Sequence, residues 1–119
     1  AKHSPPDFLV VPEKMASFIA SYQIDGMHPV ERAARVHVDF VGIHPFVDGN
    51  GRSSRLLMNL ELMKAGYPPV VITVEQRLRY YQALDAAHVE GSYQSFIELV
   101  TEAVEQSFTP YFSAVGITL

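Results

Sequence analysis

Helical periodicity, interrupted at a few points by glycine and proline, is the feature of this sequence that most limits its fold. Apolar residues recur every three to four positions, which is the spacing of one face of an α-helix. Breaks such as Asp25-Gly26, Gly66-Tyr67-Pro68-Pro69 and Gly91-Ser92 end these stretches. The pattern predicts an all-α bundle whose five helices begin near Pro12, Pro29, Arg52, Thr73 and Tyr93.

The third predicted helix, from about Arg52 to Ala65, is apolar on nearly every side. Because a helix of this kind is normally buried, we expect it at the centre of the bundle, with a polar loop at its N-terminus. Val70-Val71-Ile72 has the composition of a strand but no obvious partner. Residues 1–9 are expected to form an extended lead-in, and Pro110 is expected to kink or end the fifth helix.

Length and charge narrow the class of protein further. The 119 residues fit a single domain, 1–119, and the 48% hydrophobic content is enough for one core. A net charge of −4 argues against a nucleic-acid surface, and the absence of cysteine excludes disulfides and zinc–thiolate sites. No apolar run approaches the roughly 18 residues of a membrane span. We therefore expect no nucleic-acid or membrane partner and a cytoplasmic location. Since Ala1 is not a methionine, either Met was removed or the chain belongs to a longer protein.

The loop before the third predicted helix carries the residues that point to chemistry. Gly49 and Gly51 permit positive φ angles, and successive amides in such a turn can form an anion-binding nest at a helix N-terminus. Arg52 and Arg55 follow at the positive end of the helix dipole, where cations are unfavourable. Because guanidinium groups suit phosphate oxygens, this arrangement predicts a bound polyphosphate.

Two further side chains flank the predicted nest. Asp48 is a lone carboxylate, and Mg²⁺ is typically held by one or two carboxylates together with substrate phosphates. His44 suits a general base near neutral pH, so the set indicates transfer of a phosphorus centre to a nucleophile. His37 lies seven residues before His44 and is expected to be a hydrogen-bonded core histidine. A metal site formed by both histidines and Asp48 is the alternative.

The segment HPFVDGNGRSSR at residues 44–55 matches the Fic family signature HPFx[DE]GNGRxxR at every specified position. The chain also resembles Fic sequences at His28-Pro29, at Gly66-Tyr67-Pro68-Pro69 and at Arg79-Tyr80-Tyr81-x-Ala83-Leu84. The resemblance covers about residues 5–108. It implies a Fic-type helical bundle and a protein adenylyltransferase, which transfers AMP from ATP to a Ser, Thr or Tyr hydroxyl of a target protein and releases pyrophosphate.

The resemblance also implies a role for individual residues. It makes His44 the catalytic base, Asp48 the Mg²⁺ ligand and Phe46 the anchor that plugs the loop into the core. The ATP phosphates would be bound by Gly49, Asn50, Gly51, Arg52 and Arg55. The adenine pocket would be lined by Tyr80, Tyr81 and His88. Tyr80 and Tyr81 are adjacent, so one should face the core and the other outward.

Several alternatives stay open beside this interpretation. They are de-AMPylation at the same site, the toxin half of a toxin–antitoxin pair, and a non-catalytic nucleotide-binding module. Doc-type relatives transfer a phosphoryl group, but their nest departs from the GNGR found here.

The family's target-binding flap is expected upstream of Ala1. The nearest match to the family's inhibitory motif, Thr101-x-x-x-Glu105-Gln106, lies in a predicted core helix. Three alternatives therefore stay open for an inhibitory glutamate: an upstream segment supplies it, an antitoxin chain supplies it, or there is none. The apolar stripe on that helix is expected to pack in the core, with a homodimer interface as the alternative.

Overall fold

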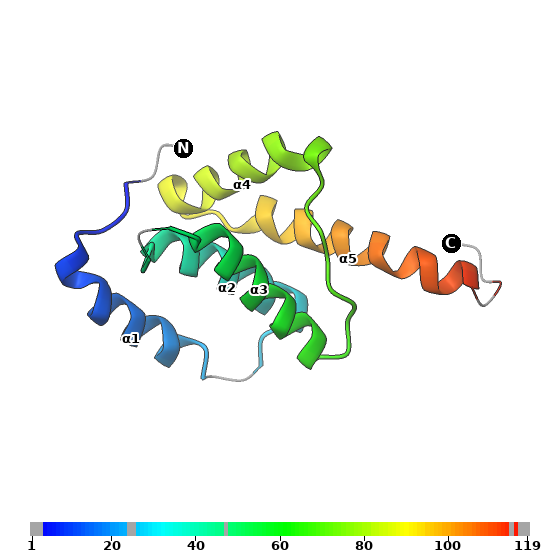
Figure 1. Cartoon of the computed structure of the whole chain (residues 1–119), viewed down its shortest axis with the longest axis horizontal. Helices are drawn as coiled ribbons and strands as arrows, with labels where there is room; N and C mark the ends of the chain where they lie inside the picture. Colours follow the sequence, from blue (N-terminus) through cyan, green and yellow to red (C-terminus); the bar gives the residue numbers. More distant parts are fainter. Residues whose placement is uncertain (1–3, 24–25, 47, 115, 117–119) are drawn as a thin grey trace.

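A computed structural model of the chain describes residues 4–23, 26–46, 48–114 and 116. All regular structure in these residues is helical, so the prediction of an all-α fold is confirmed (Figure 1). The elements are η1 (Phe8–Val10), α1 (Val11–Ser21), α2 (Pro29–Ile43), α3 (Asn50–Lys64), η2 (Val74–Gln76), α4 (Arg77–Glu90) and α5 (Gln94–Ala114). No helix in the described residues is both long and apolar enough to cross a membrane.

The helix starts follow from local sequence chemistry. Pro12 and Pro29 each lie in the first turn of a helix, where the missing N–H costs nothing. The His28 Nδ1 accepts a hydrogen bond from the Val30 N–H at 3.1 Å and so caps α2. The expected extended lead-in ends at Asp7, whose carboxylate accepts from the Leu9 N–H within a 3₁₀ turn. Residues 1–3 lie outside the described part of the chain.

The central helix of the bundle is α2, and the prediction that α3 occupies this place is wrong. α2 packs against α1, α3, α4 and α5, whereas α3 packs against α2 alone among the described elements. α3 therefore buries a single face, and Leu56, Leu60 and Met63 on its other faces are 51–62% exposed. The buried face repeats every four residues and consists of Asn50, Ser54, Met58 and Leu62.

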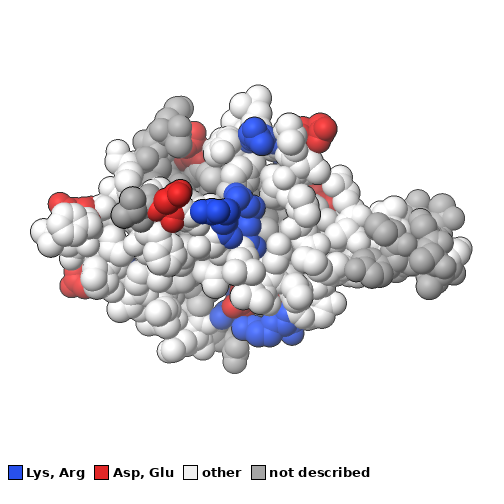
Figure 2. Space-filling view, viewed as in Figure 1, with Lys and Arg blue, Asp and Glu red and all other residues white. Residues whose placement is uncertain are grey.

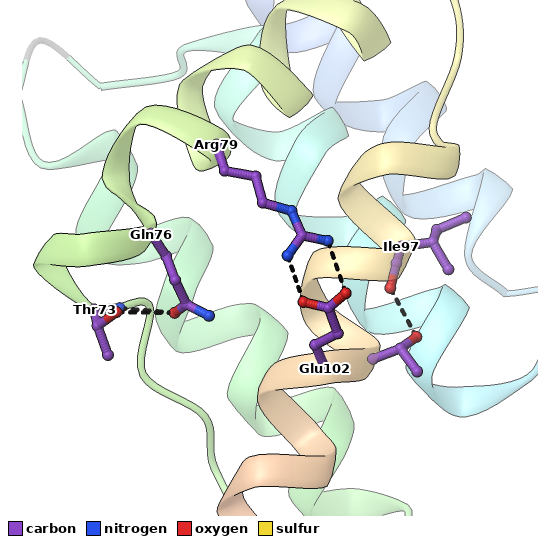
Figure 3. A network of polar contacts seen from close by, with 6 residues as sticks. Thr73, Gln76, Arg79, Ile97 and Glu102 are labelled. Atoms are coloured by element: carbon purple, nitrogen blue, oxygen red, sulfur yellow. Dashed lines mark hydrogen bonds and ion pairs between the residues drawn. The ribbon is translucent and has the colours of Figure 1, made fainter.

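The connection between α3 and α4 is extended but forms no strand. The side-chain amide of Asn59 takes the place of a neighbouring strand: its Oδ1 accepts from the Val70 N–H at 2.8 Å, and its Nδ2 donates to the Val70 carbonyl at 3.1 Å. Gln76 then turns the chain into α4, because its Oε1 accepts from both the backbone N–H (3.1 Å) and the hydroxyl (3.2 Å) of Thr73 (Figure 3). The segment between α3 and α4 thus leads into a helix that packs against both α2 and α5.

The long helix α5 closes the core. Phe96, Val100 and Val104 are buried, which confirms that this stripe packs inside the fold. Arg79 of α4 forms a bidentate ion pair with Glu102 of α5 (Figure 3). The sequence predicts a kink or an end of this helix at Pro110. An end there is wrong, since α5 continues to Ala114 and extends past the other helices (Figure 1). A proline removes one helical hydrogen bond, and the hydrogen bonds of the turns on either side maintain the helix.

Candidate active site

His44 marks the start of the candidate site and is also the residue that ends α2. It adopts a left-handed conformation, with φ 58° and ψ 55°, and it is the one residue other than glycine with positive φ in the described chain. Its N–H still bonds the Phe40 carbonyl, at 3.3 Å. A left-handed residue at this position terminates a helix. The imidazole is consequently exposed at the end of a firmly packed helix.

The side chain of Asn50 holds the loop that follows. Its Oδ1 accepts from the Phe46 N–H at 2.9 Å, its Nδ2 donates to the Phe46 carbonyl at 2.8 Å, and the residue is 5% exposed. The Asn50 amide therefore holds the loop, and the Asn50 backbone N–H, in the first turn of α3, remains for an anion in front of the helix. The expectation that Phe46 plugs the loop into the core is wrong, since the residue is 53% exposed and its ring lies 6.2 Å from the Phe40 ring, centroid to centroid. The loop is anchored through the main chain of Phe46.

The start of α3 has the features of an anion-binding helix end. Gly49 takes the N-cap position with φ 82°, and its N–H bonds the Asp48 Oδ1 at 2.8 Å. The helix begins at Asn50, two residues earlier than expected, and its first turn contains no acidic residue. The first N–H groups of a helix have no intrahelical acceptor and carry partial positive charge. They are available to an anion in front of the helix.

Both arginines of the motif fold back over this helix end. The Arg52 Nη2 lies 3.1 Å from the position that a β-carbon on Gly49 would occupy, and the Arg55 Nη1 lies 3.2 Å from the equivalent position on Gly51. Neither arginine takes part in an ion pair of the described residues. Two unpaired guanidinium groups at the positive end of a helix are unfavourable on their own, and a polyanion between them would relieve this repulsion.

The cleft formed by these groups unites most of the residues predicted from the sequence. It has a volume of about 370 Å³ and is lined by Val41, His44, Asp48, Gly49, Asn50, Gly51, Arg52, Arg55 and Tyr81. Figure 2 shows basic side chains gathered near the middle of one face of the molecule, beside an acidic one. Thr101 and Glu105 lie within α5 and are not among the residues that line the cleft.

A second cavity, of about 290 Å³, adjoins the cleft. The two cavities share Arg55 and Tyr81, and the second is completed by Ile72, Thr73, Arg77 and Tyr80. Tyr80 is buried and Tyr81 is 51% exposed, which confirms that one of the two neighbours faces the core and the other faces outward. An aromatic and polar cavity thus continues from the cleft along the N-terminal part of α4.

The structure does not bring His88 to this part of the molecule. Its Nε2 lies 2.8 Å from the Val38 carbonyl, and the residue lines a separate cavity of about 510 Å³ between the lead-in, α1 and α2. His88 follows Tyr81 by about two helical turns, which is a rise of roughly 10 Å. The expectation that His88 shares one pocket with the two tyrosines is therefore wrong.

His37 is a core residue, as expected. It is fully buried, and its Nε2 lies 2.8 Å from the Tyr80 hydroxyl. Burial lowers the pKa of His37 to about 4, so the ring is neutral at physiological pH. The alternative of a metal site formed with His44 and Asp48 finds no support, because the described residues contain no group of three or more histidine or acidic side chains placed to hold a metal.

The fold and the cleft define a helical domain with a cleft at a helix N-terminus, lined by two arginines, one histidine and one carboxylate. The model of the Fic/DOC family matches residues 1–62, and the chain belongs to this family. It is 44% identical over 117 residues to a protein adenylyltransferase Fic of Drosophila mojavensis, which covers 96% of this chain and 23% of that protein. The equivalent protein of Drosophila grimshawi is 43% identical, with 96% and 24% covered.

Solved structures agree with this assignment. The chain resembles Fic-1 of C. elegans with a TM-score of 0.83 and 37% identity, over 93% of this chain and 34% of that one. It resembles a Fic domain containing signaling protein from Bacteroides thetaiotaomicron with a TM-score of 0.89 and 30% identity, over 98% and 52% of the two chains. The chain spans about a quarter of the length of the curated relatives it matches.

Proposed function

We propose that this chain carries the transfer site of a protein adenylyltransferase, which moves AMP from ATP to a Ser, Thr or Tyr hydroxyl of a target protein. The observation that carries the proposal is the single cleft that joins His44 and Asp48 to two inward-folded arginines at the start of α3. The curated relatives named protein adenylyltransferase Fic support it.

The phosphates of ATP would bind at the N-terminus of α3. The first-turn N–H groups offer hydrogen bonds along the helix axis, and Arg52 and Arg55 offer charged donors from the side. Hydrogen-bond donors that are already in place where charge develops stabilise the transition state more than donors that must first reorganise. The base of the nucleotide would extend past Arg55 toward Tyr80 and Tyr81 in the adjoining cavity.

His44 would act on the target. Its exposed imidazole takes the proton of the target hydroxyl while that oxygen attacks the α-phosphorus, and the bond from the α-phosphorus to the bridging oxygen of the β-phosphate breaks. AMP becomes ester-linked to the target and pyrophosphate leaves. Because α2 is the central helix of the bundle, the base is held on a rigid element.

The donor set at Asp48 fits magnesium. The carboxylate is exposed, one oxygen accepts from the Gly49 N–H at 2.8 Å, and among the described residues no second acidic side chain lines the cleft. Mg²⁺ prefers such sites, where one or two carboxylates are completed by phosphates and water. When bound there, the ion would neutralise phosphate charge during transfer.

The test compares the wild-type protein with His44→Ala, using ATP labelled on the α- or the γ-phosphate, Mg²⁺ and a cell lysate. We expect label on target proteins from α-labelled ATP only, a mass gain of one AMP, and loss of this signal in the variant. Mg–ATP affinity should stay within about tenfold, because the base contacts the nucleophile.

Other outcomes separate the alternatives. Transfer of the γ-label indicates a phosphoryl transferase of the Doc type. ATP binding without any transfer indicates a non-catalytic module, and release of AMP from a modified target indicates de-AMPylation. An equal loss of binding and transfer in His44→Ala would contradict the role given to His44.

A further inference from the structure

The last turn of α2, which ends at the proposed base, borders two hollows. Val41 and His44 line the cleft, whereas Gly42 and Ile43 line the cavity of about 510 Å³ beside the lead-in and α1. The buried residues of α2 all lie between Val30 and Phe40, and the residues that follow are partly buried or exposed. Helix ends tend to fray, so packing holds this turn less firmly than the rest of α2.

The imidazole of His88 on α4 contacts this turn from the side of the larger cavity. Its Nε2 lies 2.8 Å from the Val38 carbonyl, which is also the acceptor that an α-helix assigns to the Gly42 N–H. The same nitrogen is 2.9 Å from the position that a β-carbon on Gly42 would occupy. Because a carbonyl oxygen can only accept, the Nε2 carries the proton and donates it. Glycine at position 42 is what allows the ring to come this close.

The backbone that carries His88 is well fixed. His88 lies in the last turn of α4, which is closed by Gly91 in the left-handed conformation with φ 74°. The Gly91 N–H bonds the Ala87 carbonyl at 3.1 Å, and Ala87 is buried. The Ser92 N–H bonds the Ala86 carbonyl, also at 3.1 Å. These bonds satisfy carbonyls that a helix end otherwise leaves unpaired, so the imidazole reaches α2 from a stable base.

We propose that His88 is a positioning residue, which holds the last turn of α2 and so places the His44 imidazole at the edge of the cleft. The inference rests on the proposed function, in which His44 is the base. His88 acts from the opposite side of the turn and is not among the residues that line the cleft, so it leaves that space to the substrates. A base must lie within hydrogen-bond reach of the hydroxyl, and a displacement of about 1 Å can lower the rate on the order of a hundredfold.

The first experiment measures the order of the last turn by NMR relaxation of the whole chain without ligand. The probes are the backbone amides of Ile43 and His44. We expect order parameters of about 0.85 in the wild type and a fall toward about 0.6 in His88→Ala. His88→Gln should restore the wild-type values, because its side-chain amide can donate to the Val38 carbonyl.

His28→Ala is the matched control, because His28 caps the opposite end of the same helix. Its Nδ1 accepts from the Val30 N–H at 3.1 Å. The substitution removes a histidine contact from α2 and should lower the melting temperature, yet it should leave the order at His44 unchanged. An equal fall of this order in His28→Ala would mean that any weakening of α2 loosens its end, and the inference would be overturned.

The contact can also be tested from the side of α2. Gly42→Ala should displace the His88 ring and lower the order at His44, because the added β-carbon would lie 2.9 Å from the Nε2. In a His88→Ala background the same substitution should cause no further loss, since the ring is gone. Equal losses in both backgrounds would contradict the contact. Gly42→Ala also carries the test if a thermal melt shows that His88→Ala does not fold.

The rate of transfer provides a second readout. With α-labelled ATP at saturating Mg–ATP and the proteins of a cell lysate, His88→Ala should transfer label about ten- to a hundredfold more slowly. Mg–ATP affinity, measured by calorimetry, should not change, because His88 does not line the cleft. His88→Gln should regain most of the rate, and His28→Ala should transfer at the wild-type rate.

The outcomes distinguish this inference from the proposed function. If the wild type transfers AMP and His88→Ala loses neither order at His44 nor rate, the inference fails and the function stands. A loss of order without a loss of rate also overturns the inference, as does a loss of Mg–ATP affinity equal to the loss of rate. If no protein transfers AMP but His88→Ala still loosens His44, the function fails and the placement of the imidazole by His88 stands.

Discussion

At the scale of single residues, the two glycines of the loop meet different physical needs. Gly49 has φ 82°, a conformation that other residues adopt only with strain. Gly51 lies inside α3 with an ordinary helical backbone, and what it provides is room for the Arg55 guanidinium. The sequence permits positive φ at both positions, and of the two only Gly49 adopts it in the structure.

This difference predicts opposite effects for two matched substitutions. Gly51→Ala should leave the melting temperature unchanged or raise it, because alanine favours a helix by up to about 1 kcal/mol, yet it should weaken Mg–ATP binding by displacing Arg55. Gly49→Ala should lower the melting temperature through backbone strain of about 1 kcal/mol or more. Thermal melts and calorimetry check both. Unchanged ATP affinity in Gly51→Ala would contradict the contact with Arg55.

The buried His37 should make stability depend on acid pH. The unfolded chain binds a proton at the ordinary histidine pKa near 6.5, whereas the native ring resists protonation until about pH 4. The depressed pKa means that this contribution is complete above pH 6.5 and is lost as pH falls toward 4, by up to ~3 kcal/mol. Urea unfolding of wild type and His37→Gln at several pH values measures it. Identical pH slopes in the two proteins would refute the prediction.

Much of the site could be predicted from the sequence because its residues are contiguous. The spacing of His44, Asp48 and the two arginines around a helix start is local, so the chain brings them together without help from distant elements. The buried amide of Asn50 and the contact of Tyr80 with His37 could not be predicted in this way. Both depend on which face of a helix the rest of the fold covers.

At the scale of elements, α2 and α3 show the same difference between what local sequence predicts and what the rest of the fold decides. Their positions along the chain follow from proline, glycine and apolar spacing, and these were predicted to within two residues. Which of the two helices is central was not predicted, because the leucine and methionine content of a helix indicates how apolar it is and not how many helices it packs against. α2 contacts four helices and buries small residues such as Ala33 and Ala34, which permit close approach. α3, although richer in leucine and methionine, contacts one helix.

The extended link after α3 provides a stability test at this scale. Asn59→Ala removes both hydrogen bonds to the buried Val70 backbone, so we expect a loss of about 1–3 kcal/mol in the free energy of unfolding. Gln82→Ala, on the exposed face of α4, is the matched control and should change stability by no more than about 0.5 kcal/mol. Urea denaturation of both variants measures the difference. Equal, small effects would show that the Asn59 bonds are replaced by water.

At the scale of the whole molecule, one carboxylate joins three helices. The Asp39 side chain of α2 accepts hydrogen bonds from the hydroxyls of Tyr22, which follows α1, and Tyr93, which precedes α5. The Arg35 guanidinium lies 4.4 Å from the centroid of the Tyr93 ring. The central helix is thus joined at one point to α1 and α5, and Asp39 is not among the residues that line the cleft.

This junction should make the molecule sensitive to alkali. Burial and the hydrogen bond to Asp39 raise the pKa of Tyr93 to about 12, and the same causes raise the pKa of Tyr22. A raised pKa means that the native state keeps the neutral hydroxyl, so the stabilisation is complete below pH 10 and disappears as pH rises through about 12.

Tyr93→Phe should cost about 1.5–3 kcal/mol near neutral pH, as expected for a hydrogen bond to a charged acceptor. It should also reduce the loss of stability between pH 10 and 12. Tyr81→Phe, which alters an exposed tyrosine, should follow the wild-type pH curve. Urea unfolding at pH 7, 10, 11 and 12 distinguishes the three proteins, and a Tyr93→Phe curve parallel to that of the wild type would show that the junction does not control alkaline stability.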